Sequence, residues 1–165
     1  MRSSPVRLIA ATALLVITAI GWISPSLAGS ACKDMVVTTT DLDRAGKMAG
    51  RLKAIAARED ITAAIVGRMG SDLSQYGLRY SHLGILYRED NKNIWYFRHM
   101  LNRCNTGSAG IYQEGLMNFF LDAPIRYEAI LLVPSKSRQK RLREIVLSPM
   151  FSRLFTPDYN MISNP

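Results

Sequence analysis

The stretch from Tyr80 to Leu101 contains two runs of alternating side chains, separated by the turn-forming sequence EDNKN. Polar turn residues between two such runs are typical of a β-hairpin. Successive strand residues point to opposite faces of a sheet. One face of the first run therefore carries Tyr80, His82, Gly84 and Leu86, and one face of the second run carries Trp95, Phe97, His99 and Leu101. The hairpin is the strongest constraint on the fold, because it commits the middle of the chain to antiparallel pairing.

Residues 38–60 have the apolar spacing of an amphipathic helix. Thr40, followed three residues later by Asp43, predicts a capping box at its start. Gly46 and Gly50 are unusual inside a helix, where each costs about 1 kcal/mol relative to alanine. Their spacing predicts a bare helix face against which another element packs closely.

The remaining segments complete an α+β pattern. In chain order the sequence predicts the first helix, a buried strand at 61–70, a helical turn within 70–77, the hairpin, a loop at 104–110, a helical turn at 113–120, a buried strand at 127–133, a helix at 135–147 and a further turn at 148–155. Ser135 or Ser137 is expected to cap the last helix. We predict a small antiparallel sheet built around the central hairpin and flanked by an N-terminal and a C-terminal helix.

Residues 1–28 have the layout of a secretory signal peptide. The apolar run is shorter than the roughly twenty residues that span a bilayer. We therefore expect cleavage before Gly29 and no transmembrane helix after processing; a lipoprotein signal ending at Cys32 is the alternative. The features are two arginines, an uncharged apolar run and two small residues before the cut: Arg2, Arg7, 8–23, Ser26 and Ala28. The expected location is the periplasm or the exterior.

Removal of this segment leaves residues 29–165, a length typical of one domain, and lowers the formal net charge from +8 to +6. The final residues, TPDYNMISNP, have the composition of a loop rather than of a packed element. A domain usually ends in an exposed linker or after a packed element. We therefore expect a single α+β domain that is truncated at its C-terminal end.

The processed chain would retain two cysteines, Cys32 and Cys104. An even cysteine count in an oxidising compartment favours a disulfide, which here would hold the N-terminus to the domain. The alternative is two free, buried thiols. Cys104 follows a strand and enters a Gly/Ser loop, whereas a catalytic thiol usually lies at a helix N-terminus or beside a cation. Arg103 is such a cation, but a disulfide is the expected fate of Cys104.

His82 and His99 are the only histidines in the chain. His82 could be a general base on a rigid strand, with Tyr80, Ser81 or the loop Gly70–Gly77 at the rim of the site, or a packed residue of a strand face. For His99 a structural role is expected. A two- or four-residue hairpin loop would pair the histidines on one face, whereas a three- or five-residue loop would place them on opposite faces. The turn sequence permits both.

Other chemistry has little support in the sequence. No acidic cluster accompanies the histidines, so we expect no metal site. No GxSxG elbow is present, and GSDLSQYG lacks the lysine and spacing of a phosphate loop, so no cofactor is expected. The basic run from Lys136 to Arg143 could contact anionic lipid or cell-wall polymer, or be a solvated helix face. Nucleic acid is not expected as a partner, because the protein is predicted to be exported and aromatic residues are missing from the run.

Four segments, taken in order, resemble a family of exported bacterial proteins, domain-of-unknown-function family 2145. They are GSDLSQYGLRYSHLGILYR, HMLNRC, YQEGLMNFFLD and LFTPDYNMISNP, and the resemblance covers most of residues 32–165. The family has no established activity, so the resemblance implies none here. It implies a chain that continues beyond Pro165 with a further strand and helix.

The sequence YSHLGI also resembles the histidine strand of permuted papain-like hydrolases of the NlpC type, in which the cysteine lies later in the chain. Only His82 can be matched, and no cysteine follows Cys104. The sequence therefore leaves three hypotheses. The chain could be an exported, catalytically degenerate relative of these hydrolases. It could be an active amidase or peptidase that acts on cell-wall peptide or lipid, with its nucleophile beyond Pro165. It could also be a non-enzymatic periplasmic binding module.

Overall fold

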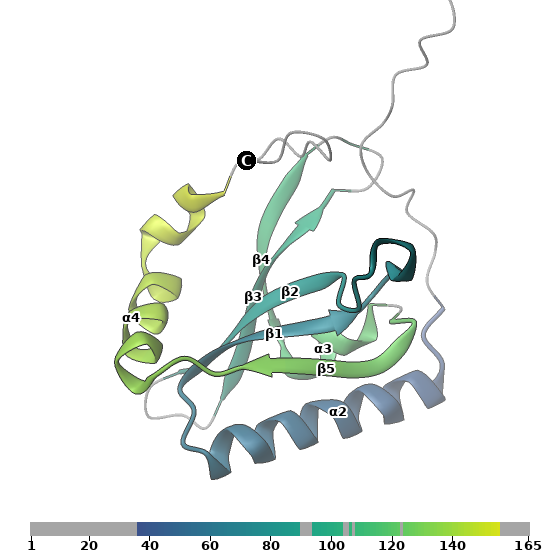
Figure 1. Ribbon diagram of the computed structural model, residues 1–165, viewed down its shortest axis with the longest axis horizontal. Helices are drawn as coiled ribbons and strands as arrows, with labels where there is room; N and C mark the ends of the chain where they lie inside the picture. Colours follow the sequence, from purple (N-terminus) through teal and green to yellow (C-terminus); the bar gives the residue numbers. More distant parts are fainter. Residues whose placement is uncertain (1–35, 90–93, 104–105, 107, 123, 156–165) are drawn as a thin grey trace, which may run out of the picture.

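The computed structural model describes residues 36–89, 94–103, 106, 108–122 and 124–155. Five antiparallel strands form one sheet in the order β4-β3-β2-β1-β5 (Figure 1). The strands are β1 (Ala63–Met69), β2 (His82–Arg88), β3 (Trp95–Asn102), β4 (Ala109–Gly115) and β5 (Arg126–Leu132). The helices are α2 (Thr39–Arg58), α3 (Leu116–Leu121), α4 (Lys136–Leu147) and two 3₁₀ helices, η1 (Ser74–Tyr76) and η2 (Pro149–Leu154). The predicted α+β class is confirmed, with the β2–β3 hairpin in the middle of the sheet.

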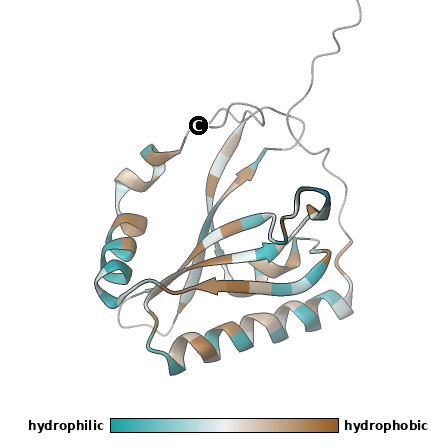
Figure 2. Ribbon diagram, in the orientation of Figure 1, coloured by the Kyte–Doolittle hydropathy of each residue, from teal (hydrophilic) through white to brown (hydrophobic). Residues whose placement is uncertain are grey.

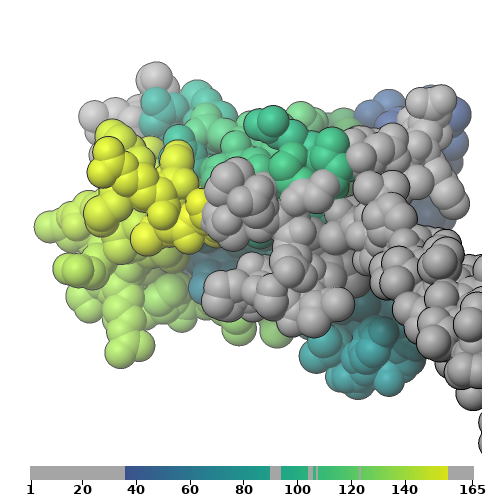
Figure 3. All heavy atoms as spheres, turned by 90° about the horizontal axis from the view of Figure 1, so that it is seen from above, coloured from purple at the N-terminus to yellow at the C-terminus, as the bar shows by residue number. Residues whose placement is uncertain are grey.

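Helices α2 and α3 cover one face of the sheet. Their buried side chains pack on alternate residues of β1, β2 and β3 and form the larger core. This core contains Ala45, Leu52, Ala56, Ile61, Ala64, Val66, Leu86, Trp95, Phe97, Phe119 and Phe120. Helix α4 and η2 cover the opposite face with a smaller core of Ala63, Tyr87, Val146 and Phe151. Figure 3 shows η2, in yellow, against α4 at one end of the molecule. We refer to the two sides as the α2/α3 face and the α4 face.

Helix α2 begins two residues earlier than the sequence predicted. Thr38 is its N-cap and forms the capping box with Asp41, so the predicted box of Thr40 and Asp43 is wrong. The run of three threonines offers several caps, and Thr38 places a carboxylate at the third helical position. Figure 2 shows hydrophobic and hydrophilic residues alternating along α2, as an amphipathic helix requires.

The prediction for the two glycines of α2 is not supported in the described part of the chain. A side chain at either Gly46 or Gly50 would meet no atom within 4 Å. The buried stripe is formed instead by Ala45, Leu52 and Ala56. The glycines lie beside this stripe, so no described element packs closely on them.

The predictions for the two edge strands need correction. The segment predicted as the loop 104–110 and the helical turn 113–120 contains β4, and α3 begins only at Leu116. β4 is an edge strand with two glycines and little alternation in burial, so its sequence lacks the usual strand pattern. The predicted strand at 127–133 exists as β5, but it forms the other edge of the sheet and none of its residues is fully buried.

The C-terminal helix α4 has Ser135 at its N-cap, as predicted, although that side chain makes no capping hydrogen bond. Its basic residues do not form a uniform solvated face. Lys136 pairs with Asp60 at 3.0 Å, and Arg143 donates to the Arg88 carbonyl at 2.7 Å. The side chains of Arg138, Lys140 and Arg141 are exposed. Within the described ranges, no helix has the length and apolar character needed to cross a membrane.

Candidate functional site

A diagonal row of polar side chains crosses four strands on the α2/α3 face. Arg68 on β1 pairs with His82 on β2. Leu86 on β2 pairs with Phe97 on β3, and Phe97 pairs with Glu114 on β4. Because paired and alternate residues share a face, Arg68, His82, His99 and Glu114 all point to the same side of the sheet. The row lies beyond the apolar core of that face.

The hairpin register resolves the two alternatives left open by the sequence. The histidines share one face, but they are diagonal neighbours rather than direct partners, because the register is shifted by two residues from a direct pairing of His82 with His99. Gly84 is the next residue of β2 on the same face as His82, beside His99. A side chain at Gly84 would come within 3.0 Å of the Phe119 ring and 3.5 Å of the His99 side chain. The glycine therefore leaves room for His99 and Phe119.

The two imidazoles are in direct contact. His82 Nε2 lies 2.7 Å from His99 Nδ1, a hydrogen-bond distance. His99 Nε2 lies 3.3 Å from a Glu114 carboxylate oxygen, within ion-pair distance, although it forms no regular hydrogen bond with a described residue. A carboxylate accepts and cannot donate, so it favours the proton on His99 Nε2. His99 Nδ1 then accepts from His82 Nε2–H, which leaves His82 Nδ1 unprotonated.

Both histidines are held in the neutral form. Burial, followed by the charge of Arg68 and the neighbouring His99, lowers the pKa of His82 to about 4. Burial also lowers the pKa of His99, with the Glu114 carboxylate opposing the shift. Near pH 7 neither ring carries a proton on both nitrogens, so each has one donor and one acceptor. In this state the contacts from Glu114 through His99 leave a lone pair on His82 Nδ1.

Phe119 of α3 lies over the histidines. Its ring centroid is 5.7 Å from that of His82 and 5.4 Å from that of His99, and it stacks on Phe97 at 4.1 Å. Arg68 stabilises this position from the other side. Its guanidinium lies 5.3 Å from the Phe119 ring centroid and donates to the Asp122 carbonyl, at 2.6 Å, and to the Asp122 carboxylate. The end of α3 is thus attached to β1, and the phenyl ring covers part of both imidazoles, of which His99 is buried and His82 is half-buried.

The two predicted rim residues have other hydrogen-bond partners. The Tyr80 hydroxyl donates to Glu128 at 2.9 Å, and Glu128 also pairs with Arg79 at 2.6 Å. The Ser81 hydroxyl oxygen accepts from the backbone N–H groups of Gly70 and Ser71, at 2.9 and 2.7 Å. Ser81 therefore connects β2 to the start of the loop Gly70–Gly77. The rim role of either residue stays a prediction.

Cys32 and Cys104 lie outside the described residues, so their disulfide also stays a prediction. Among the residues that the structure describes, no group of three histidine, cysteine, aspartate or glutamate side chains could hold a metal ion.

Sequence reasoning missed Arg68, Glu114, Phe119 and Asp122 as parts of this site. One signal was available for Arg68, because it is the only charged residue in the apolar run 61–70. A charge in a buried strand needs a partner. Glu114 could not have been found without β4, which the sequence did not predict.

Comparison with known proteins identifies the family of the chain. Residues 55–165 match the model of a family described as uncharacterised proteins conserved in bacteria, domain of unknown function 2145. The chain belongs to this family. No curated protein sequence and no solved structure matched the chain. The matched residues include Arg68, His82, His99 and Glu114, whereas most of α2 precedes them. The family carries no activity that could be assigned to this chain.

Proposed function

We propose that this chain is an exported protein that carries the base half of a hydrolytic site, with His82 as the general base. The proposal rests on two contacts, Glu114 with His99 and His99 with His82. Together they place the proton of neutral His82 on Nε2 and leave the lone pair on Nδ1. A base held on a rigid strand and oriented by a second and third group is the usual arrangement behind an activated nucleophile. The resemblance of YSHLGI to the histidine strand of papain-like hydrolases supports the same assignment.

The proposed reaction is acyl transfer from an amide or ester. A thiol or hydroxyl nucleophile, supplied from outside the described residues, attacks the carbonyl carbon while its proton passes to His82 Nδ1. The imidazolium then returns this proton to the leaving amine or alcohol. Water, activated by the same base, releases the acyl group. Cell-wall peptide or lipid is the substrate class expected for an exported enzyme.

The depressed pKa of His82 sets a condition on this mechanism. A base with a pKa of about 4 is unprotonated at neutral pH, but it removes a proton only with a weak driving force. A thiolate or alkoxide beside the ring would stabilise the imidazolium and raise this pKa. His82 would therefore act as a base only when the nucleophile lies beside it. A chain without the nucleophile would retain only a neutral histidine pair, which is the degenerate form of the same site.

Nitrogen-15 NMR can test the relay directly, because the chain has only two histidines. We expect both rings to be neutral at pH 7, with the proton on Nε2. Glu114→Leu should remove the tautomer preference of His99 and, through it, that of His82. Glu128→Leu is the matched control, since Glu128 pairs with Arg79 and Tyr80 on another part of the sheet. A proton on Nδ1 of His82 in the wild-type protein would rule out the relay.

Activity requires a separate test on the protein secreted from its natural host. Intact mass should show a chain that begins near Gly29, without a lipid on Cys32. Fluorogenic amides and esters, peptidoglycan fragments, iodoacetamide and a fluorophosphonate then report turnover and nucleophile reactivity. An active enzyme should lose both in His82→Gln. Absence of turnover and of labelling in the wild-type protein would contradict catalysis and favour the degenerate form.

A further inference from the structure

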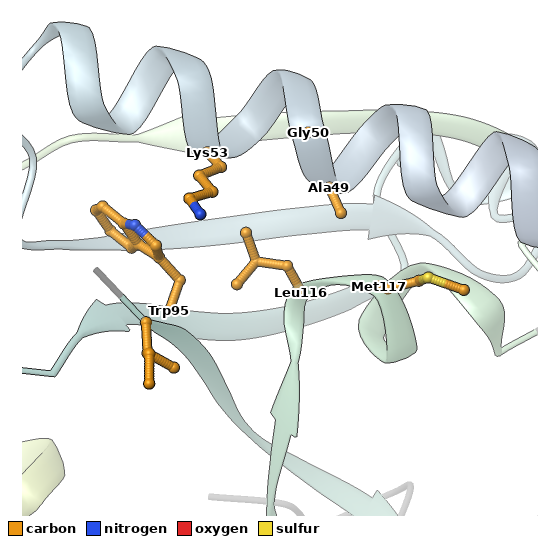
Figure 4. Close-up of a pocket in the computed structure, with 7 residues that line it drawn as sticks. Ala49, Gly50, Lys53, Trp95, Leu116 and Met117 are labelled. Atoms are coloured by element: carbon orange, nitrogen blue, oxygen red, sulfur yellow. The ribbon is translucent and has the colours of Figure 1, made fainter. Parts of the chain in front are cut away.

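A second site lies on the α2/α3 face, at the opposite end of α3 from the histidines. It is a groove of about 400 Å³ between α2, the start of β3 and the start of α3. Figure 4 shows the groove with its lining side chains. These are Ala49, Gly50, Lys53, Ile94, Trp95, Leu116 and Met117. Most of the lining is apolar, and no carboxylate of a described residue contributes to it.

Two nitrogen donors converge on this apolar groove. Figure 4 shows Lys53 reaching from α2 into the groove and the indole nitrogen of Trp95 turned toward the same space. Trp95 is 4% exposed, and its Nε1–H is buried without a hydrogen-bond acceptor among the described residues. Lys53 forms no ion pair with a described residue. A buried donor without an acceptor is destabilising, so a ligand that supplies an acceptor gains that free energy on binding.

The polar groups around the groove favour a ligand with a negative charge. Both polar groups donate and neither can accept, so they fit an acceptor with a negative charge. The Arg88 guanidinium lies 5.8 Å from the Trp95 ring centroid and adds to the positive charge, although it is also 3.9 Å from the Asp60 carboxylate. The exposed apolar atoms of Ile94 and Met117, 41% and 37% exposed, require a ligand that also carries an apolar part.

We propose that this groove binds a single amphiphile with an anionic head group. Lys53 Nζ and Trp95 Nε1 hold the carboxylate or phosphate oxygens of the head, and the apolar chain lies against Ile94, Leu116 and Met117. The site is separate from the proposed hydrolytic site. His82 is not part of the lining, so the loss of either site leaves the other testable.

Tryptophan fluorescence provides the assay. The chain has two tryptophans, Trp22 and Trp95, and Trp22 lies in the predicted signal peptide, so the processed protein carries Trp95 as its reporter. Dodecanoate and dodecyl phosphate are the probes, and dodecanol, acetate and inorganic phosphate are the controls. We expect saturable binding of both anionic amphiphiles, about tenfold weaker binding of dodecanol, and none of acetate or phosphate. Equal affinity for dodecanol and dodecanoate, or no saturable binding, would overturn the proposal.

Substitutions in α2 separate the head contact from the groove. Lys53→Met should weaken binding of the anionic probes about tenfold and leave dodecanol unchanged, and Lys53→Arg should restore the anionic preference. Gly50→Leu should fill the groove and abolish binding of dodecanoate, dodecyl phosphate and dodecanol. Its matched control is Gly46→Leu, one turn away on the same helix, where a side chain also meets no atom within 4 Å. Lys47→Met controls for the charge change.

Both leucine variants replace a glycine in the same helix, so circular dichroism should show equal folding and gains in thermal stability. A binding loss confined to Gly50→Leu then reports the groove itself. Unchanged binding in Gly50→Leu, or in Lys53→Met, would contradict the proposed site. His82→Gln should leave binding unchanged, which keeps this result independent of the hydrolytic proposal.

Discussion

The two faces of the sheet bury polar groups in different ways. On the α4 face, Gln139 accepts from the Thr62 backbone N–H at 2.9 Å and donates to the Pro134 carbonyl at 2.8 Å. The Tyr87 hydroxyl donates to Gln113 at 2.6 Å. On the α2/α3 face, three buried nitrogen atoms have no hydrogen-bond partner among the described residues. These are Arg68 Nε, Trp95 Nε1 and His99 Nε2.

The polar groups of the α4 face are explained by the fold alone, whereas the unsatisfied nitrogens of the α2/α3 face need another explanation. Buried polar groups in folded proteins are nearly always hydrogen-bonded, because an unsatisfied group lowers stability. The α4 face follows this rule and needs no ligand to explain it. The α2/α3 face departs from it at three places, two in the row of strand residues and one in the groove. Departures of this kind are expected at functional sites, where stability is lower than packing alone would allow.

The largest predicted effect compares one buried phenylalanine on each face. Phe119→Ala and Phe151→Ala should each lower the free energy of unfolding by about 3–5 kcal/mol, measured by urea denaturation, because both rings are almost fully buried. Only Phe119→Ala should also raise the pKa of His82, since it exposes that ring to water. Asn118→Ala, an exposed neighbour, should change stability by at most about 0.5 kcal/mol. Equal histidine titration in both phenylalanine variants would contradict the shielding role of Phe119.

The second effect is a loss of stability in acid that originates on the α2/α3 face. The folded pKa of His82 is about 4, below its ordinary value of 6.5, so the unfolded chain binds a proton first as the pH falls. The stabilising contribution is complete above about pH 6.5 and is lost between pH 6.5 and 4. It amounts to at most about 3 kcal/mol. His99 acts in the same direction, because burial lowers its pKa too.

The measurement is the free energy of unfolding as a function of pH for the wild-type protein and His82→Gln. Carboxylates titrate in both proteins, so the difference between the two slopes isolates the histidine. The variant should have the shallower slope between pH 6.5 and 4. Parallel curves would show that His82 is not desolvated in the folded chain.

The third effect comes from removing a buried hydrogen bond on the α4 face. Gln139→Leu leaves the Thr62 N–H without its acceptor and should lower the free energy of unfolding by about 1–3 kcal/mol. The exposed neighbour Lys140→Leu should change it by at most about 0.5 kcal/mol. Neither substitution should alter histidine titration or amphiphile binding. A nearly neutral Gln139→Leu would mean that polar groups on the two faces do not differ in this way.

The sequence predicted the fold better than the site, for a physical reason. Alternation over His82–Arg88 and Trp95–Asn102 identified the hairpin, because each strand carries its own period of two. The register between strands depends on contacts across them, so contact of His82 with His99 could not be deduced from the turn sequence. Glu114 lies on an edge strand that lacks clear alternation, and Arg68 lies in an apolar run. A site that spans four adjacent strands requires all three pairings between them, and the sequence predicted only the β2–β3 pairing.

The smallest effect is on α2, the helix that covers the α2/α3 face, and it tests whether glycines there have a packing role. Gly46→Ala should stabilise the protein by about 0.5–1 kcal/mol, because alanine loses less backbone entropy on folding and the new methyl group meets no described atom within 4 Å. Gly84→Ala is the opposite case on the same face, since its methyl group would lie 3.0 Å from the Phe119 ring and should destabilise the chain. Thermal denaturation of the two variants measures both signs. Destabilisation by Gly46→Ala would revive the interpretation that another element packs closely on the glycines of α2.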